Sequence, residues 1–251
     1  MSMILTCINP TSDILGDPQN PEMISHNDSQ LLYGETFEVE KEHGAYVYGH
    51  SMHDGYTGYI DRGDLIKNGP EANAIITSRM AHLYQAPSFQ SRPYMQLSIG
   101  SKLNLEDKPE DNFYKTYDGY WVYKDSLQFL KNYKAQDDLA DIALKFFDTP
   151  YLYGGRSIYG VDCSGLVQMS IFLFNLTSQK RDSKDQRSTI GREIKKDQLK
   201  RNDIVFFEGH VGIMMDEENI LNATSRHMTT LIEPLSDLEK AYDRILSIRR
   251  L

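Results

Sequence analysis

The chain has 251 residues, with 27 basic and 36 acidic side chains that give a net charge of -9. This length suits one large domain or two to three small ones, and hydrophobic and charged fractions of 40% and 25% indicate a folded globular protein. The acidic balance argues against a nucleic acid, and against an anionic membrane surface, as the main partner.

Cysteine usage and the first residues bear on the cellular compartment. Cys7 and Cys163 are the two cysteines and lie far apart in unlike contexts, so we expect a lone functional thiol rather than a disulfide framework. The start, MSMILTCINPTSD, has no basic region and only a short apolar run, which argues against a secretory signal. No run reaches the length of a membrane span. We therefore expect a cytoplasmic protein, with export by an unseen route as the alternative.

The first half of the chain predicts short strands. Residues 1–24 are rich in Asn, Pro, Asp and Ser and predict an irregular arm. Short β-type runs separated by turns follow in two stretches, and this spacing is typical of small barrels. We therefore expect a first SH3-like barrel over residues 25–68 and a second over residues 72–128. The strand candidates are residues 36–39, 45–48, 56–60, 73–78, 95–97 and 120–123.

From residue 136 to residue 251 the pattern changes to helices followed by strands. Asp137 or Asp138 can cap a first helix, and a second, buried helix is expected over residues 163–174. A polar loop over residues 177–189 comes next. A helix pair followed by an antiparallel sheet is an α+β fold. The apolar face of the first helix comprises Leu139, Ile142, Ala143, Phe146 and Phe147, and the strand candidates are residues 203–207, 210–215, 220–223 and 245–248.

The segment DCSGL places Cys163 at the first turn of the buried helix. Unpaired backbone N–H groups and the helix dipole favour a negative charge there, so we expect a stabilised thiolate. A cysteine that only fills the core is the alternative. The glycine-rich segment YLYGGRSIYG just upstream permits a substrate to approach the helix closely. A packing cysteine does not require this, and the context therefore favours a nucleophile.

A thiol nucleophile needs a base, and the base needs a partner that orients it. His210 follows a turn at the start of an expected strand, and Asn222 lies further on between apolar neighbours. The carbonyl of an Asn side chain can accept a hydrogen bond from the imidazole N–H and so fix its tautomer. A structural histidine is the alternative for His210, and His227 is the alternative for the orienting role.

These residues resemble a known family. YLYGGRSIYGVDCSGLVQ followed by LKRNDIVFFEGHVGIMMDEENILNA is similar to the NlpC/P60 cysteine peptidases, papain-like enzymes that cut bacterial murein peptides. The resemblance covers residues 136–251. It implies that Cys163 is the nucleophile, His210 the general base and Asn222 the orienting residue. Relatives most often carry His at the third position, although Asn and Gln occur.

The upstream segment extends the resemblance. SQLLYGETFEVEKEHGAYVYGHSMHDGYTGYI is similar to the first bacterial SH3-type domain of the γ-D-glutamyl-L-diamino acid endopeptidases, the dipeptidyl-peptidase VI group. In that group the barrel closes one end of the substrate groove. The resemblance implies a murein peptide with a free N-terminal L-Ala followed by γ-D-Glu, cut after the D-Glu. It further implies that Tyr151, Asp162 and Ser164 hold the dipeptide from the catalytic side, and that Glu35 and Tyr56 hold it from the barrel.

Alternatives to these roles and to this function remain. Asp162 can simply cap the helix, and Glu35 can be an ordinary exposed acid. A broader cell-wall amidase or endopeptidase on the same scaffold would have a groove open at both ends, and a catalytically inactive wall-binding protein would act through its barrels. No cofactor or metal is implied, because His50 and His53 have no third ligand nearby and are expected in a solvent-facing loop. Meso-diaminopimelate and L-Lys both fit as the third residue of the substrate.

Overall fold

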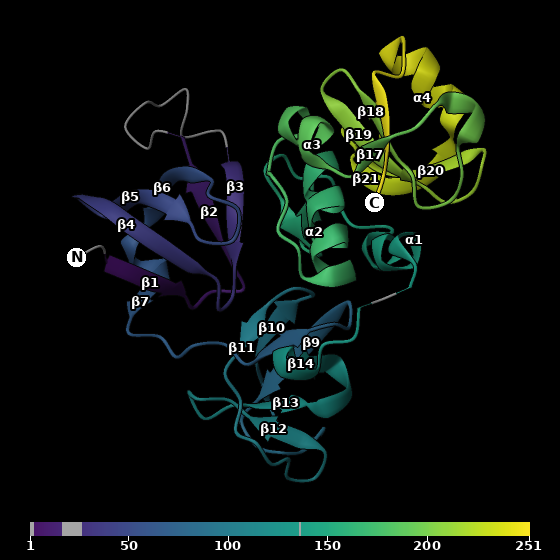
Figure 1. Cartoon of the computed structure of the whole chain (residues 1–251). Helices are drawn as coiled ribbons and strands as arrows, with labels where there is room; N and C mark the ends of the chain where they lie inside the picture. The colour runs from purple at the N-terminus through teal and green to yellow at the C-terminus, as the bar shows by residue number, and fades with distance from the viewer. Residues whose placement is uncertain (1–2, 17–26, 136) are drawn as a thin grey trace. The chain divides into compact units, whose positions relative to one another are not determined.

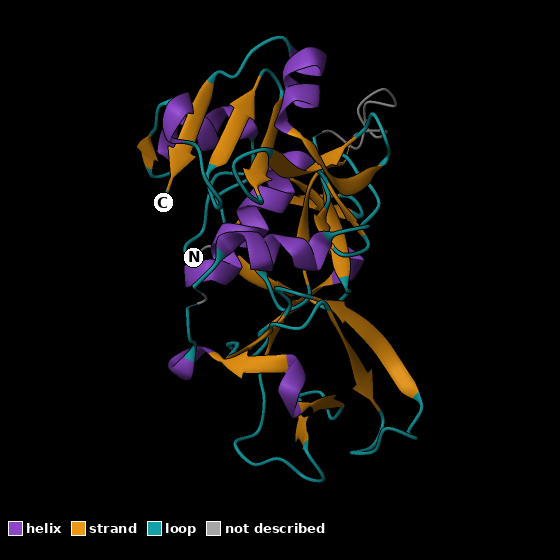
Figure 2. Ribbon diagram, turned by 90° about the vertical axis from the view of Figure 1, so that its right-hand side faces the viewer, coloured by secondary structure: helices purple, strands orange, loops and turns teal. Residues whose placement is uncertain are grey.

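The computed structural model describes residues 3–16, 27–135 and 137–251. The chain divides into two compact units, with the boundary between Lys134 and Ala135. Strands and three short 3-10 helices build the described part of the first unit, and the four α-helices of the described residues all belong to the second (Figure 1). Figure 2 shows the same elements coloured by type. Among the described residues, no helix combines the length and the apolar composition needed to cross a membrane.

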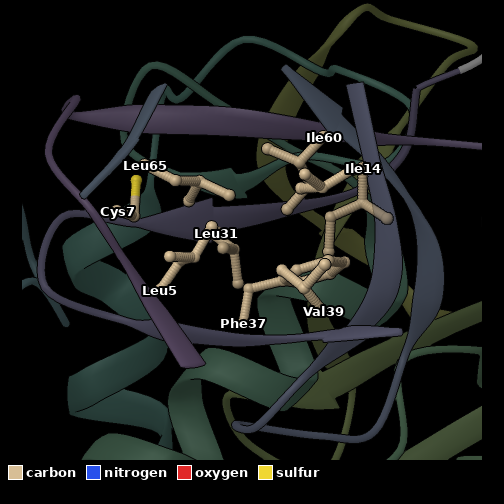
Figure 3. Packing of buried hydrophobic residues seen from close by; sticks show 9 residues of the cluster. Leu5, Cys7, Ile14, Leu31, Phe37, Val39, Ile60 and Leu65 are labelled. Atoms are coloured by element: carbon tan, nitrogen blue, oxygen red, sulfur yellow. The ribbon is translucent and has the colours of Figure 1, made fainter. Parts of the chain in front are cut away.

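The first seven strands form one antiparallel sheet in the order β3-β2-β6-β5-β4-β1-β7. Successive side chains of a strand point to opposite faces, and in β5 every second residue is accordingly buried, starting at Val47. The inward residues of several strands meet in one apolar core (Figure 3). The strands are β1 Met3–Cys7, β2 Thr11–Leu15, β3 Asn27–Leu32, β4 Thr36–His43, β5 Tyr46–Ser51, β6 Thr57–Asp61 and β7 Leu65–Lys67.

The prediction of an irregular arm is wrong for the residues of β1 and β2. β1 pairs with β4 on one side and with β7 on the other, and its residues Leu5 and Cys7 fill the core. β2 pairs with β3 and contributes Ile14 to the same core. Partners distant in the sequence stabilise both strands, so the polar composition of the segment did not reveal them. The rest of the predicted arm, residues 17–24, lies outside the described residues.

A second group of strands packs around its own apolar core, with Leu83, Leu97 and Val122 fully buried. The group forms a four-stranded sheet, β10-β9-β13-β12, and a three-stranded sheet, β11-β8-β14. The strand candidates at 73–78, 95–97 and 120–123 are confirmed as β8, β10 and β13. The strands are β8 Ala74–Ile76, β9 Met80–Tyr84, β10 Pro93–Ser98, β11 Lys102–Leu103, β12 Phe113–Lys115, β13 Trp121–Tyr123 and β14 Leu127–Phe129.

The second unit has the predicted α+β character. Its six-stranded antiparallel sheet has the order β17-β22-β18-β19-β20-β21, and α2 packs against β19, β20 and α1 (Figure 1). The helices are α1 Leu139–Ala143, α2 Cys163–Asn175, α3 Ser183–Thr189 and α4 Leu235–Tyr242. The strands are β15 Arg156–Ser157, β16 Gly160–Val161, β17 Arg192–Glu193, β18 Ile204–Phe207, β19 His210–Met214, β20 Asn219–Thr224, β21 Thr229–Pro234 and β22 Ser247–Arg250.

One of the two predicted caps of the first helix is confirmed: it is Asp138, whose carboxylate accepts from the backbone N–H of Asp141 at 3.1 Å. Other expectations for this unit need correction. Phe147 is 38% exposed rather than part of the buried face. The expected polar loop contains helix α3. This helix was missed because a short polar helix gives no apolar periodicity in the sequence. β21 and α4 were not predicted at all, and both contribute side chains around His210.

Candidate active site

The thiol is placed by a tight connection between a glycine-rich loop and α2. Asp162 is the N-cap of α2, and its Oδ1 accepts from the backbone N–H of Gly165 at 2.7 Å. A Cβ atom at Gly165 would lie 2.2 Å from the carbonyl oxygen of Gly155, so only glycine permits this close approach. Cys163 is therefore the first residue of a helix whose start is fixed by a cap and by backbone packing. The predicted helix start is confirmed.

A buried arginine that was not predicted as a site residue holds the cap. Arg181 is 3% exposed, and its Nη1 and Nη2 donate to Oδ1 and Oδ2 of Asp162 at 3.0 and 2.6 Å. The same Nη1 donates to Ser164 Oγ at 2.8 Å, and Gly154 N–H donates to the second carboxylate oxygen at 2.8 Å. Asp162 thus caps the helix, as the alternative prediction stated, and forms an ion pair with Arg181. In the sequence Arg181 stands in a polar segment, where nothing distinguishes a buried cation from a solvated one.

The structure favours a neutral thiol at Cys163 in place of the expected thiolate. Burial of the thiol, and secondarily the negative charge of Asp162, raise the pKa of Cys163 to about 12. Hydrogen bonds from the backbone at Val211 and Ser164, together with the charge of Arg181, act in the opposite direction but do not outweigh burial. The helix terminus alone therefore does not ionise this sulfur, and a base must remove its proton as the sulfur attacks.

His210 is suited to that task. It begins β19, is 4% exposed, and its Nε2 lies 2.9 Å from Asn222 Oδ1 on the neighbouring β20. The predicted hydrogen bond between the two residues is confirmed, whereas His227 lies exposed in the turn that follows β20. Burial lowers the pKa of His210 to about 4, so the imidazole is neutral at neutral pH and one ring nitrogen keeps a free lone pair, while the low pKa makes this nitrogen a weak base. Val211, the next residue of β19, hydrogen-bonds the Cys163 sulfur and brings this end of the strand to the start of α2.

The residues expected to hold substrate on the catalytic side gather at the start of α2. Tyr151 is half-buried, and burial raises the pKa of its phenol, with smaller contributions from Cys163 and Asp162. The phenol is therefore a neutral hydrogen-bond donor near the thiol. Ser164 is 7% exposed, and its Oγ lies 3.2 Å from Asp162 Oδ1. The structure brings Tyr151, Asp162, Cys163 and Ser164 together, as the resemblance implied.

Glu35 and Tyr56, the two residues expected to act from the barrel, belong to the first unit. Glu35 is 1% exposed, its Oε2 accepts from the backbone N–H of Leu32 at 2.9 Å, and its Oε1 lies 3.4 Å from His53 Nδ1. Tyr56 is partly buried against the first core. The expectation of a solvent-facing His53 is wrong, because this residue is 7% exposed. The roles of Glu35 and Tyr56 toward a substrate remain predictions.

Comparison with known proteins finds one family match in each of the two units. The NlpC/P60 family profile matches residues 148–245, and the profile of the bacterial dipeptidyl-peptidase SH3 domain matches residues 20–65. A Haemophilus influenzae protein named as a probable endopeptidase is 33% identical over 114 residues, which cover 39% of this chain and 70% of that protein. The γ-D-glutamyl-L-lysine dipeptidyl-peptidase of Bacillus subtilis is 29% identical over 245 residues, or 88% of this chain and 80% of that protein.

A solved structure shares the fold. The crystal structure of an NlpC/P60 family protein from Bacillus cereus aligns with a TM-score of 0.82 at 20% identity, covering 98% of this chain and 99% of that chain. The α+β unit is therefore an NlpC/P60 fold, and an SH3 domain precedes it. The chain belongs to the NlpC/P60 family of cysteine peptidases.

Proposed function

We propose that the enzyme hydrolyses the bond between γ-D-Glu and the diamino acid in murein peptides that carry a free N-terminal L-Ala. The observation that carries the proposal is a buried thiol at a helix start that is hydrogen-bonded by Val211, the neighbour in sequence of His210, whose neutral imidazole is oriented by an amide. The specificity is supported by the Bacillus subtilis relative named for γ-D-glutamyl-L-lysine peptides, because its similarity extends over 88% of the chain and includes the SH3 domain.

The proposed reaction has two steps. His210 takes the proton of the Cys163 thiol while the sulfur attacks the γ-carbonyl carbon of D-Glu, and the backbone N–H of Cys163 stabilises the oxyanion. The bond to the amine of the diamino acid then breaks, and His210 gives its proton to that amine. In the second step His210 accepts a proton from water, the hydroxide attacks the thioester, and the thiol is restored. The dipeptide L-Ala-γ-D-Glu leaves with a free γ-carboxylate.

Recognition of the dipeptide is assigned to five side chains. Tyr151, Asp162 and Ser164 act from the start of α2, and Glu35 and Tyr56 act from the SH3 domain. Asp162 is already paired with the Arg181 guanidinium. We therefore propose that Glu35 is the main partner of the substrate's ammonium group. An ammonium group in a closed site requires a carboxylate partner.

We also propose that residues 72–128 form a second SH3-type barrel. Two small antiparallel sheets around a separate apolar core support this assignment. The chain would then carry two small barrels ahead of its catalytic domain.

The bond that is cut tests the proposed function. L-Ala-γ-D-Glu-L-Lys and its meso-diaminopimelate counterpart are incubated with the enzyme, and the products are identified by mass spectrometry. We expect the dipeptide L-Ala-γ-D-Glu and the diamino acid from at least one of the two peptides. Cleavage between L-Ala and D-Glu, or no cleavage of either peptide, would contradict the proposal.

Replacement of His210, the base, is expected to lower kcat more than replacement of Asn222, the residue that orients it. His210→Ala eliminates the group that moves the proton, whereas Asn222→Ala leaves an imidazole that still samples the productive orientation. We expect kcat to fall by about a thousandfold or more for His210→Ala and by about ten- to a hundredfold for Asn222→Ala. Steady-state kinetics on the same peptide measures both, with thermal unfolding as a check of the fold. Equal losses in two folded variants would mean that Asn222 does more than orient His210.

A further inference from the structure

The partner of Asn222 on its other side is an acid. Asn222 Nδ2 donates to Glu233 Oε1 at 2.9 Å, from β20 to the adjacent β21. Glu233 is 9% exposed, and the same oxygen accepts from the Arg226 guanidinium. The guanidinium only donates hydrogen bonds, so Glu233 Oε1 acts as an acceptor in this contact as well, and a carboxylate oxygen does not donate. Glu233 can therefore bind only the NH₂ end of the Asn222 amide.

The orientation of the Asn222 amide in turn decides which ring nitrogen of His210 carries the proton. With its NH₂ end committed to Glu233, the amide presents Oδ1 to His210, and the distance from Oδ1 to Nε2 is 2.9 Å. An amide oxygen only accepts, so Nε2 must carry the proton. A neutral imidazole carries one ring proton, which leaves the lone pair on Nδ1. Nδ1 is then the atom that can take the proton of a thiol.

The plane of the imidazole is fixed by an aromatic ring from α4. Tyr242 stacks on His210 with ring centroids 4.5 Å apart and planes inclined by 7°. Arg226, already paired with Glu233, lies 5.8 Å from the centroid of Tyr242. The contacts thus run from His210 through Asn222, Glu233 and Arg226 to Tyr242 and back to His210. Asn222 contacts the edge of the imidazole and is itself bound by Glu233. Tyr242 contacts its face and is itself in contact with Arg226.

We infer that Glu233 is a positioning residue that selects, through Asn222, the tautomer of His210 with its lone pair on Nδ1, while Tyr242 and Arg226 hold the ring plane. The inference rests on the proposed role of His210 as the base and not on the identity of the substrate. An amide whose orientation nothing else fixes is compatible with either tautomer, because its two ends are interchangeable in shape. Glu233 removes that ambiguity.

The tautomer is measured directly by ¹⁵N NMR of histidine-labelled protein near neutral pH, with His210→Gln used to assign the signals. In the unmodified enzyme we expect Nε2–H and an unprotonated Nδ1 at His210.

Glu233→Met removes the acceptor at similar length and is expected to give a mixture of tautomers. Glu233→Gln should stay close to the unmodified enzyme, because its carbonyl oxygen can still accept from Asn222. Glu217→Met, at an exposed acid in the turn after β19, is the matched control. An Nδ1–H tautomer in the unmodified enzyme, or an unchanged spectrum in Glu233→Met, would overturn the inference.

Kinetics separates positioning from general support of the fold. We expect Glu233→Met to lower kcat by about ten- to a hundredfold with little change in KM, and to have less than about a twofold further effect in the Asn222→Ala background. A residue that only stabilises the sheet would lower activity to a similar degree in both backgrounds, and that result would contradict the inference. If no γ-D-Glu peptide is cut, the proposed function fails, but the NMR result still decides the tautomer.

Titration of His210 gives a second signature. The charged and titratable groups that act on the imidazole or stack on it are Asp162, Arg226, Glu233 and Tyr242. Glu233 and Asp162 raise the pKa of His210 and Arg226 lowers it, each less than burial does. Glu233→Gln should therefore move the His210 titration to lower pH, and Arg226→Gln should move it to higher pH. Shifts in the same direction for the two variants would speak against this arrangement of charges.

Discussion

Cys163→Ala is expected to abolish hydrolysis, because the sulfur forms the covalent bond to the substrate and alanine offers no nucleophile. Loss of a catalytic nucleophile typically lowers kcat by about a millionfold, which places the variant at background. Cys163→Ser is expected to be inactive as well, since a buried hydroxyl with a base whose pKa is about 4 is far harder to ionise than a thiol. Product formation from a γ-D-Glu peptide, followed by chromatography over hours, measures both variants.

Cys7 provides the matched control. It is also buried, and burial raises its pKa to about 12, but it lies in the core of the first unit near Ser12. Cys7→Ala should retain full turnover and lose about 1 kcal/mol of stability from the core. Turnover by a folded Cys163→Ala variant, or equal inactivation by Cys7→Ala, would refute the assignment of the nucleophile.

The main elements of the site could be predicted because each is local in the sequence. An acid, a cysteine and a glycine in DCSG specify a capped helix start with a thiol at its first residue. A histidine at the beginning of one strand and an Asn in the middle of the next place both side chains on neighbouring strands, and they meet at 2.9 Å. Short-range patterns of this kind survive in almost any tertiary context, so they can be read without a structure.

The features that escaped prediction depend on partners far away in the chain. β1 is stabilised by pairing with β4 and β7, and no local pattern in its five residues specifies those partners. Glu233 and Tyr242 belong to β21 and α4, two elements that were not predicted, and only the fold places them near His210. The raised pKa of Cys163 was likewise not predicted. Burial of the thiol outweighs the favourable effect of the helix terminus, and the sequence at the helix start does not reveal that burial.

Acetylation of the N-terminal alanine is expected to stop cleavage. In the proposed function the ammonium of L-Ala pairs mainly with Glu35, a carboxylate that is 1% exposed. Acetylation removes the positive charge and adds bulk, so the carboxylate would be left without that partner in a desolvated site. Removal of one partner of a buried charge pair typically costs several kcal/mol, which corresponds to at least about a hundredfold loss of kcat/KM. Parallel kinetics on L-Ala-γ-D-Glu-L-Lys and its N-acetyl derivative measures the ratio.

Glu35→Gln then links the selectivity to one side chain. The amide oxygen of Gln can still accept from the backbone N–H of Leu32, as Glu35 Oε2 does at 2.9 Å, so the variant should fold. Its kcat/KM should fall by about tenfold or more on the free-amine peptide and change little on the acetylated one. Glu40→Gln, at an exposed acid of the same domain, should leave both values unchanged. Comparable cleavage of the two peptides by the unmodified enzyme would mean that the amine is not recognised. The enzyme would then be a general cell-wall endopeptidase whose first barrel takes no part in substrate selection.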